Sequence, residues 1–390
     1  MTPATDQSSE THGGDDEIRL VNLGGKVDAD SLFRLYEQQE GDDETPITVR
    51  FRLQHDLNKR LDLYLVDRIP FLSRTSLQRL IREESVTVND RVPKVSTKLH
   101  KNDVIVVVLP PPPTSVIQPE DIPLDVLHED DDLIVLNKAA GIIVHPARGY
   151  KTGTLLHALA WHFKYKSKGT LSAVGEEFAR PGVVHRLDRN TTGVMLAAKS
   201  DTAHWRLAKQ FADRTTHKRY LAVVHGEIDT PADTIDLPIG KHPTVKEKYA
   251  VRWDSTAKPS TTIYHVREIY DGYSLVELDL KTGRTHQIRV HLSHLGHPIV
   301  GDDMYGGHPV RLADVNPRAT EHADDIVMGR QALHAALLQF NHPATDVRIT
   351  MQAPLPADLQ NFVRLLRKHR FKRAVKTSGA KIDLDQMISR

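Results

Sequence analysis

The sequence predicts an α+β protein, in which a mixed, largely antiparallel sheet with flanking helices follows a smaller α/β domain. Apolar or alternating segments typical of strands recur along the larger part of the chain, over Asp132–Asn137, Val194–Lys199, Tyr220–His225, Thr261–Tyr270, Ser274–Leu280 and Val347–Met351. Several strands follow one another through short turns such as Asp271-Gly272, which favours antiparallel pairing over a regular βαβ arrangement. Helical spacing occurs in Thr154–His162 and Thr202–Phe211, and these segments are expected to flank the sheet.

The first 50 residues are expected to form an acidic, largely disordered tail. Residues 1–49 contain twelve Asp or Glu against three Lys or Arg, which gives a net charge of −9. Such a segment has little apolar surface to bury. A short helix over Ser31–Glu40, with Ser31 as its N-cap, is compatible with this sequence.

A compact smaller domain is predicted over residues 55–108. Lys59–Asp67 and Ser73–Glu84 have helical spacing, and Ser73 is the expected N-cap of the second helix. Val86–Val92 is an alternating strand that enters an Asn-Asp turn, and Asp103–Leu109 is a second strand.

A proline-rich linker over residues 109–123 separates this domain from the larger one. Its run Pro110–Pro113 should be stiff and extended. The larger domain is predicted over residues 124–375 and is followed by a C-terminal tail, residues 376–390. Within the larger domain, the polar and unpatterned segment His308–Gly329 is predicted to be a loop.

Charge and composition favour an intracellular protein that binds a polyanion. The net charge is +1, so the chain beyond residue 49 carries 1 − (−9) = +10. Residues 50–104 have a local charge of +5, and Arg364–Lys376 contains seven basic residues and no acidic one. The chain has no cysteine, no apolar stretch near the ~18 residues of a membrane span, and an N-terminus without an apolar signal segment. A cytoplasmic monomer without membrane contact is expected.

The run Val184–Gly193 is the main candidate for chemistry. Its carboxylate, Asp188, lies between Arg186 and Arg189, and Thr-Thr-Gly then leads into a second apolar segment. A carboxylate beside fixed positive charge stays ionised and can act as a nucleophile or base. The guanidinium groups also match phosphate oxygens. Taken alone, an Arg-x-Asp-Arg sequence is more often a surface ion pair.

Other chemistries find little support in the sequence. No glycine pattern of a dinucleotide fold or a phosphate-binding loop is present, so no cofactor is expected. A histidine-rich segment raises the possibility of a metalloenzyme, but its spacing gives no clear ligand face, and no metal is expected; its members are His286, His291, His294 and His297. A zinc deaminase needs cysteine ligands that this chain lacks.

Four blocks of the sequence resemble the motifs of the RluA/RluD-type pseudouridine synthases. Together they extend over about residues 126–357, in the family's order, and comprise Asn137–Gly141 with Val144–Pro146, His185–Gly193, Lys218–Gly226, and Gly283–His291 with Gly296–Ile299 and Gly301-Asp302. There are departures from the family's pattern: Asn190 where Asp is usual, Thr192 where Ser is common, and Ala139 where Pro is usual. None of these falls on a catalytic position.

The resemblance implies roles for particular residues. Asp188 is implied to be the catalytic carboxylate, Tyr220 the active-site tyrosine and Arg289 the basic partner that keeps the aspartate charged. Arg186 is expected to occupy the stack vacated by a flipped uridine, and His185 is expected to contact the RNA backbone. The smaller domain resembles an S4 RNA-binding domain, whose expected RNA-facing residues are Arg60, Arg74, Arg79, Arg82 and Lys98.

The expected activity is the isomerisation of specific uridines to pseudouridine, most strongly in large-subunit (23S) ribosomal RNA. A transfer-RNA enzyme and a non-catalytic S4-type RNA-binding or ribosome-assembly protein are the alternatives. The carboxylate could attack C1′, add to C6 of the base or remove a C2′ proton, and the sequence does not choose among these routes.

Overall fold

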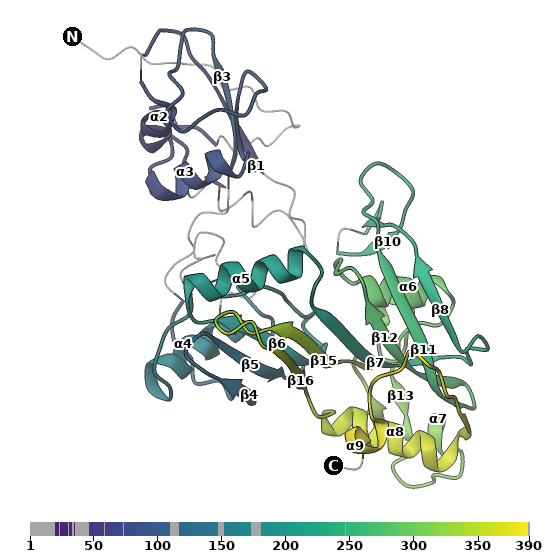
Figure 1. The fold of residues 1–390 in the computed structure, drawn as a ribbon. Coiled ribbons are helices and arrows are strands. Elements are labelled where there is room, and N and C mark those ends of the chain that lie inside the picture. The colour runs from purple at the N-terminus through teal and green to yellow at the C-terminus, as the bar shows by residue number, and fades with distance from the viewer. Residues whose placement is uncertain are drawn as a thin grey trace. The chain divides into compact units, whose positions relative to one another are not determined.

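A computed structural model of the 390-residue chain describes residues 20–22, 24–29, 31–32, 35, 47–57, 59–72, 74–109, 117–146, 152–172, 181–245 and 247–388. The chain divides into two compact units, one formed mainly by residues up to 117 and the other by most of the chain from residue 118 onward (Figure 1). Each unit has its own hydrophobic core. None of the described helices is long and apolar enough to cross a membrane.

The smaller unit is a three-stranded antiparallel sheet packed against two helices. Its elements are β1 (Ile47–Arg52), α2 (Leu61–Arg68), α3 (Arg74–Arg82), β2 (Val86–Val88) and β3 (Val104–Leu109), with the strand order β1-β3-β2. The predicted helices and strands are confirmed. Asn89 and Asp90 both have positive φ, 49° and 60°, so the Asn-Asp turn has the backbone twist that suits a hairpin.

Part of the acidic segment belongs to this unit, and the rest of it lies largely outside the described residues. Leu20, Val27 and Leu32 are buried in the core of the smaller unit, and β1 begins at Ile47, before the predicted start at residue 55. The cap at Ser31 is also wrong, because the Ser31 backbone N–H donates to the Asp28 carboxylate. Ser73 and Pro110–Pro113 lie outside the described residues.

The larger unit contains a ten-stranded mixed sheet with the order β17-β11-β12-β7-β15-β6-β5-β4, in which β16 also pairs with β15 and β8 with β11. Its strands are β4 (Val126–Glu129), β5 (Leu133–Lys138), β6 (Thr192–Ala198), β7 (His217–His225), β8 (Ala232–Asp236), β11 (Thr261–Tyr270), β12 (Tyr273–Leu280), β15 (Leu333–Asn341), β16 (Arg348–Gln352) and β17 (Phe371–Ala374). Pairing is antiparallel except between β15 and β6, which are parallel. The predicted fold class is confirmed.

Helices and small hairpins lie against this sheet. The helices are α4 (Leu155–Tyr165), α5 (Asp201–Ala212), α6 (Gln287–His294), α7 (Leu312–Val315), α8 (Ala357–His369) and α9 (Leu384–Ile388), with a short 3₁₀ turn, η2 (Asp303–Tyr305). One hairpin pairs β9 (Ile239–Lys241) with β10 (Tyr249–Val251), and another pairs β13 (Val310–Arg311) with β14 (Ile326–Met328). Figure 1 shows α5 lying over β6 and β15, where Ala203 and Leu207 enter the core.

Two predicted irregular segments are ordered instead. The segment His308–Gly329 forms the β13–β14 hairpin and α7, with Val310, Val315 and Met328 buried. The C-terminal tail packs on the larger unit through α9, and the Glu277 carboxylate accepts hydrogen bonds from the backbone N–H groups of Lys381 and Ile382.

Candidate active site

The predicted catalytic carboxylate and its predicted basic partner meet in the structure. Asp188 lies in the loop before β6, and Arg289 projects from α6. The Arg289 Nη1 atom donates to Asp188 Oδ2 at 3.1 Å, across 101 residues of sequence. Arg289 is buried, whereas the Asp188 side chain remains 22 % exposed. The carboxylate is therefore held on its inner side and open on its outer side.

A second carboxylate, Asp302, fixes the orientation of Arg289. Its side chain is buried and accepts from Arg289 Nε at 2.7 Å and from Arg289 Nη2 at 2.9 Å. This bidentate pair uses one edge of the guanidinium and leaves Nη1 for Asp188. Burial alone lowers the pKa of Arg289, but Asp302 and Asp188 outweigh it and raise that pKa, so the arginine stays charged. Asp302 falls within one of the four sequence blocks, but the sequence alone predicts no role for it.

Electrostatics keep Asp188 ionised at neutral pH. Burial by itself raises the pKa of Asp188, but the positive charges of His286, Arg289 and Arg186 outweigh it and hold that pKa below its usual range. Arg186 is exposed in the same loop. The site therefore presents an anionic carboxylate beside an exposed cation, as the motif predicted.

Tyr220 lies close to this carboxylate on β7 and is buried. Burial raises the pKa of Tyr220, and the negative charge of Asp188 raises it further. The phenol is therefore neutral at physiological pH, so it can donate a proton or a hydrogen bond but does not act as a phenolate.

His286 and Tyr305 line the other side of Asp188. His286 is the N-terminal flanking residue of α6 and has a left-handed backbone, with φ of 53°. Its Nε2 lies 3.9 Å from Asp188 Oδ2, and its Nδ1 is hydrogen-bonded to the Tyr305 hydroxyl at 2.8 Å. The same hydroxyl accepts from the backbone N–H of Tyr249, which ties β10 to the site.

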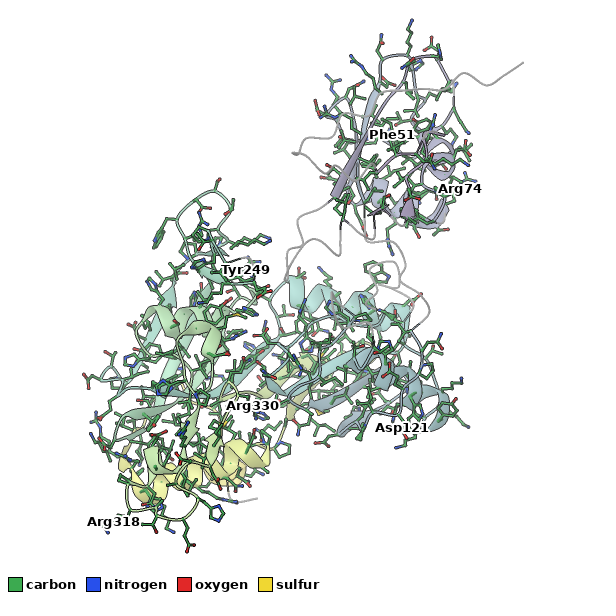
Figure 2. The ribbon with its side chains drawn as sticks, turned by 180° about the vertical axis from the view of Figure 1, so that it is seen from behind. Phe51, Arg74, Asp121, Tyr249, Arg318 and Arg330 are labelled. Atoms are coloured by element: carbon green, nitrogen blue, oxygen red, sulfur yellow. The ribbon has the colours of Figure 1, made fainter. Side chains whose placement is uncertain are left out.

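The loop that carries Asp188 is supported from the segment before β15. Arg330, near the middle of the larger unit in Figure 2, donates through Nη1 to the Asn190 carbonyl at 3.1 Å. Gln331 Nε2 donates to Thr191 Oγ1 at 2.6 Å. At Gly193, where φ is +113°, a Cβ would lie 2.2 Å from the Ala335 carbonyl oxygen, so only glycine fits there. The departure at Asn190 therefore leaves this support intact, because the contact uses the backbone carbonyl.

Lys138 joins the same loop to the segment after β5. Its side chain is buried, and Nζ donates to the carbonyl oxygens of Ala139, Ile142 and Arg189 at 2.8, 2.9 and 3.0 Å. Burial lowers the pKa of Lys138 to about 7, although the charge of Asp188 opposes this change. The lysine was noted in the sequence only as part of a motif, because its three contacts depend on the folded loop.

His334 fixes the Thr192 hydroxyl and gives the fold a pH dependence. Its Nδ1 is hydrogen-bonded to Thr192 Oγ1 at 2.8 Å and its Nε2 to the Ala353 carbonyl at 3.1 Å. Burial lowers the pKa of His334 from 6.5 to about 4. Between these two pH values the unfolded chain binds a proton that the folded chain does not. The contribution of His334 to stability is therefore complete above pH 6.5 and is lost as the pH falls towards 4.

We expect a His334→Gln variant to be less stable than the wild type at pH 7.5. This gap, the difference in the free energy of unfolding between the two proteins, should narrow as the pH falls to 4. The part of this gap that depends on pH is about 3 kcal/mol. Urea unfolding at several pH values measures it, and His322→Gln, which alters a largely exposed histidine, is the control. A gap that stays constant with pH would contradict the assignment.

His185, predicted to contact RNA, is instead used within the fold. Its Nε2 accepts from the backbone N–H of Leu196 at 3.0 Å, and its ring stacks on Phe211 with centroids 4.6 Å apart. Burial, followed by the charge of Lys218, lowers its pKa to about 3, which keeps the ring neutral. His185 therefore holds the loop against β6 and α5, and its contact with RNA stays a prediction.

The predicted RNA-facing residues of the smaller unit are only partly free. Arg60 and Arg74 both donate to the fully buried carboxylate of Asp62, yet each side chain is about half exposed. Lys98 is exposed, and its backbone bridges to that of Arg60. Arg79 lies 3.8 Å from Glu83, and Arg82 is exposed. Three of the five, Arg60, Arg74 and Lys98, therefore gather at one place beside α2 and α3, where Figure 2 labels Arg74.

Elsewhere in the described residues, a cluster of two aspartates and one histidine is poorly suited to bind a metal ion. The atoms of Asp130, Asp132 and His342 lie within 4.8 Å of one another. However, His342 Nδ1 accepts from the backbone N–H groups of Ala344 and Thr345, so its Nε2 carries the proton and donates to Asp130. A nitrogen that carries a proton cannot bind a metal.

Comparison with known proteins agrees with this geometry. Residues 132–294 match the family model described as RNA pseudouridylate synthase. An uncharacterised RNA pseudouridine synthase of Bacillus subtilis is 38 % identical over 80 % of this chain and 95 % of its own length. The ribosomal large subunit pseudouridine synthase D of Pasteurella multocida is 36 % identical over 82 % of this chain and 95 % of its own. A solved structure, human RNA pseudouridylate synthase domain containing 1, matches at 26 % identity over 70 % of this chain and 95 % of that chain, with a TM-score of 0.48. The chain belongs to the RNA pseudouridylate synthase family, whose motifs its four blocks resemble.

Proposed function

We propose that this enzyme converts specific uridines of large-subunit ribosomal RNA to pseudouridine, with Asp188 as the catalytic carboxylate. The observation that carries the assignment of Asp188 is the chain of contacts from buried Asp302 through Arg289 to a carboxylate that remains partly exposed. Relatives named for the large ribosomal subunit support the choice of substrate.

The reaction breaks the N1–C1′ bond of uridine, turns the base and joins C5 to C1′. The proton on C5 is lost and N1 gains one, so neither an oxidant nor an energy source is consumed. Asp188 starts the reaction by attack at C1′, by addition to C6 or by removal of the C2′ proton. In each case the carboxylate must be ionised, which Arg289, His286 and Arg186 favour.

Two residues act on the base itself. The ring of Tyr220 packs against the flipped uracil, and its hydroxyl, which stays neutral, can donate a hydrogen bond within the pocket. Arg186, exposed in the loop, takes the place of the uridine in the RNA stack. The smaller unit acts as an S4-type RNA-binding module, in which Arg60, Arg74 and Lys98 contact phosphates.

Release of tritium from C5 tests both the reaction and the substrate. Purified enzyme is incubated with large-subunit ribosomal RNA, or with total transfer RNA, each transcribed from the source genome with 5-³H-uridine. We expect release from the ribosomal RNA and little from the transfer RNA. Tritium release from transfer RNA alone would make transfer RNA the substrate in place of ribosomal RNA. Release from neither RNA would favour a non-catalytic RNA-binding protein.

A further inference from the structure

The C-terminal end of α4 and the residues after it carry an unusual mixture of aromatic and basic side chains. The sequence there reads Trp161-His162-Phe163-Lys164-Tyr165-Lys166-Ser167-Lys168. The surrounding segment, from Leu133 to Gly175, contains six Lys or Arg and no Asp or Glu. This cluster of Trp161, Lys164, Tyr165, Lys166 and Lys168, here called the α4 platform, has no part in the site around Asp188.

Side chains of the α4 platform contact one another through aromatic and cation–π interactions. The rings of Trp161 and Tyr165 are 5.4 Å apart at 48°. Lys166 Nζ lies 4.8 Å from the Trp161 ring centroid, and Lys164 Nζ lies 5.1 Å from that of Tyr165. Tyr165 is 60 % exposed, and all three lysines are exposed. An exposed aromatic ring is therefore flanked by positive charges.

Packing of the helix does not require this arrangement. The buried side of α4 is formed by other residues, among them Leu155, Leu156, Leu159 and Phe163. Within the described part of the chain, no ion pair joins the three lysines to a carboxylate. The nearby acid Glu129 is already matched, because it pairs with Lys199 Nζ and with His162 Nε2, each at 2.8 Å. Among the described residues, the positive charge of the platform is therefore not matched by an acidic side chain.

The helix also connects the platform to the catalytic loop. At its N-terminal end, the backbone N–H groups of Leu155 and Leu156 donate to the carbonyls of Ile143 and Val144. The same segment meets the catalytic loop, where the Gly141 N–H donates to the Arg189 carbonyl at 3.0 Å. The eleven residues of α4 span about 16 Å, which is a distance of a few nucleotides along a strand. Figure 1 shows α4 at the end of the sheet formed by β4 and β5.

We propose that the α4 platform binds unpaired nucleotides of the RNA substrate that flank the target uridine. A base stacks on the exposed ring of Tyr165 in place of the Lys164 side chain, and Lys164, Lys166 and Lys168 contact the adjoining phosphates. This proposal rests on the RNA substrate proposed above. Two features favour RNA over a protein partner. The charged side chains of the platform are all positive, as suits a polyanion. These cations also lie over the aromatic rings, whereas a typical protein-binding surface would present an apolar patch.

Binding of a fluorescein-labelled 12-mer oligouridylate, followed by anisotropy at several salt concentrations, tests the platform. For Tyr165→Ala we expect the Kd to rise about 10-fold, because base–aromatic stacking is lost. For the triple variant Lys164→Gln/Lys166→Gln/Lys168→Gln we expect the slope of log K against log salt to become shallower by about 2, at about 0.7 for each phosphate contact. Tyr165→Phe, which keeps the ring, and Lys209→Gln, which removes an exposed lysine on α5, should bind like the wild type.

Single-turnover tritium release at saturating ribosomal RNA separates this proposal from the proposed function. All four variants should release tritium at the wild-type rate, since none alters the site of Asp188. Unchanged Kd and salt slope in both Tyr165→Ala and the triple variant would overturn the platform, as would be found if the surface bound another protein. Absence of tritium release from the wild type would instead overturn the proposed function, and the oligouridylate result would still stand.

Discussion

Replacing Asp188 by Asn should abolish tritium release, with a fall in rate on the order of 10⁴-fold or more. The amide has the shape of the carboxylate but neither its charge nor its nucleophilicity, so all three routes from uridine are blocked. The fold should survive, because Arg289 keeps its bidentate partner Asp302 and is not left as an isolated buried charge. RNA affinity should be equal or higher, since a negative charge is removed near the substrate phosphates.

The measurement is single-turnover release from 5-³H-uridine ribosomal RNA, together with the Kd for the same RNA and the urea midpoint. Asp303→Asn is the matched control, because Asp303 is an exposed aspartate on η2 that makes no contact with Arg289. A rate for Asp188→Asn within 10-fold of the wild type would sink the assignment of Asp188. A collapse of its stability would show that Asp188 is primarily structural.

Asp302→Ala should damage both stability and rate. The buried guanidinium of Arg289 would lose two hydrogen bonds and its charge partner, and breaking such a pair costs about 3–5 kcal/mol. Arg289 would also be free to turn towards Asp188, which would misplace the carboxylate. We expect the rate at saturating RNA to fall about 100-fold, comparable to the loss of one preorganised group in an active site.

Asp302→Asn separates the two effects. It retains the shape and one acceptor oxygen, so it should fold more stably than the alanine variant while still losing most of the rate. The measurements are the midpoint of urea unfolding and the single-turnover rate, and Asp303→Asn again serves as the control variant. If Asp302→Asn kept the wild-type rate, the charge on Asp302 would not be what positions Arg289.

The sequence was most informative where function resides in a short motif. Asp188, Arg289 and Tyr220 were each predicted from their blocks, and the structure brings them together from a loop, a helix and a strand. The sequence could not show what holds them. Asp302 and Lys138 act through contacts made only after folding, with partners up to 51 residues away in the chain.

Side-chain direction is the second thing that the sequence left open. His185 is three residues from Asp188, yet it points back into the sheet and accepts a backbone N–H, because a loop has no fixed periodicity from which to infer orientation. Arg60 and Arg74 are expected to face RNA from the resemblance to an S4 domain, but the buried carboxylate of Asp62 also holds them. A basic residue in a sequence does not reveal whether its charge is already matched within the fold.

Short strands and helical turns were also not predictable from the sequence. Residues 308–329 form a two-residue strand, a single helical turn and a three-residue strand, and none is long enough to show a period. Among the described residues of the acidic N-terminal segment, those buried in the core of the smaller unit, such as Leu20, Val27 and Leu32, are scattered along the sequence. A few buried apolar residues barely change the composition of a 50-residue segment, so composition alone does not reveal them.

The position of β15 between β7 and β6 also determines when the enzyme becomes competent during its own synthesis. Asp188, Tyr220 and Arg289 all leave the ribosome before residue 330, but the loop that carries Asp188 is held by Arg330, Gln331 and His334. The central strand of the sheet thus arrives late, and contacts of such long sequence separation form slowly. A nascent chain that ends before residue 330 therefore contains Asp188, Tyr220 and Arg289 but lacks the contacts that hold the Asp188 loop in place.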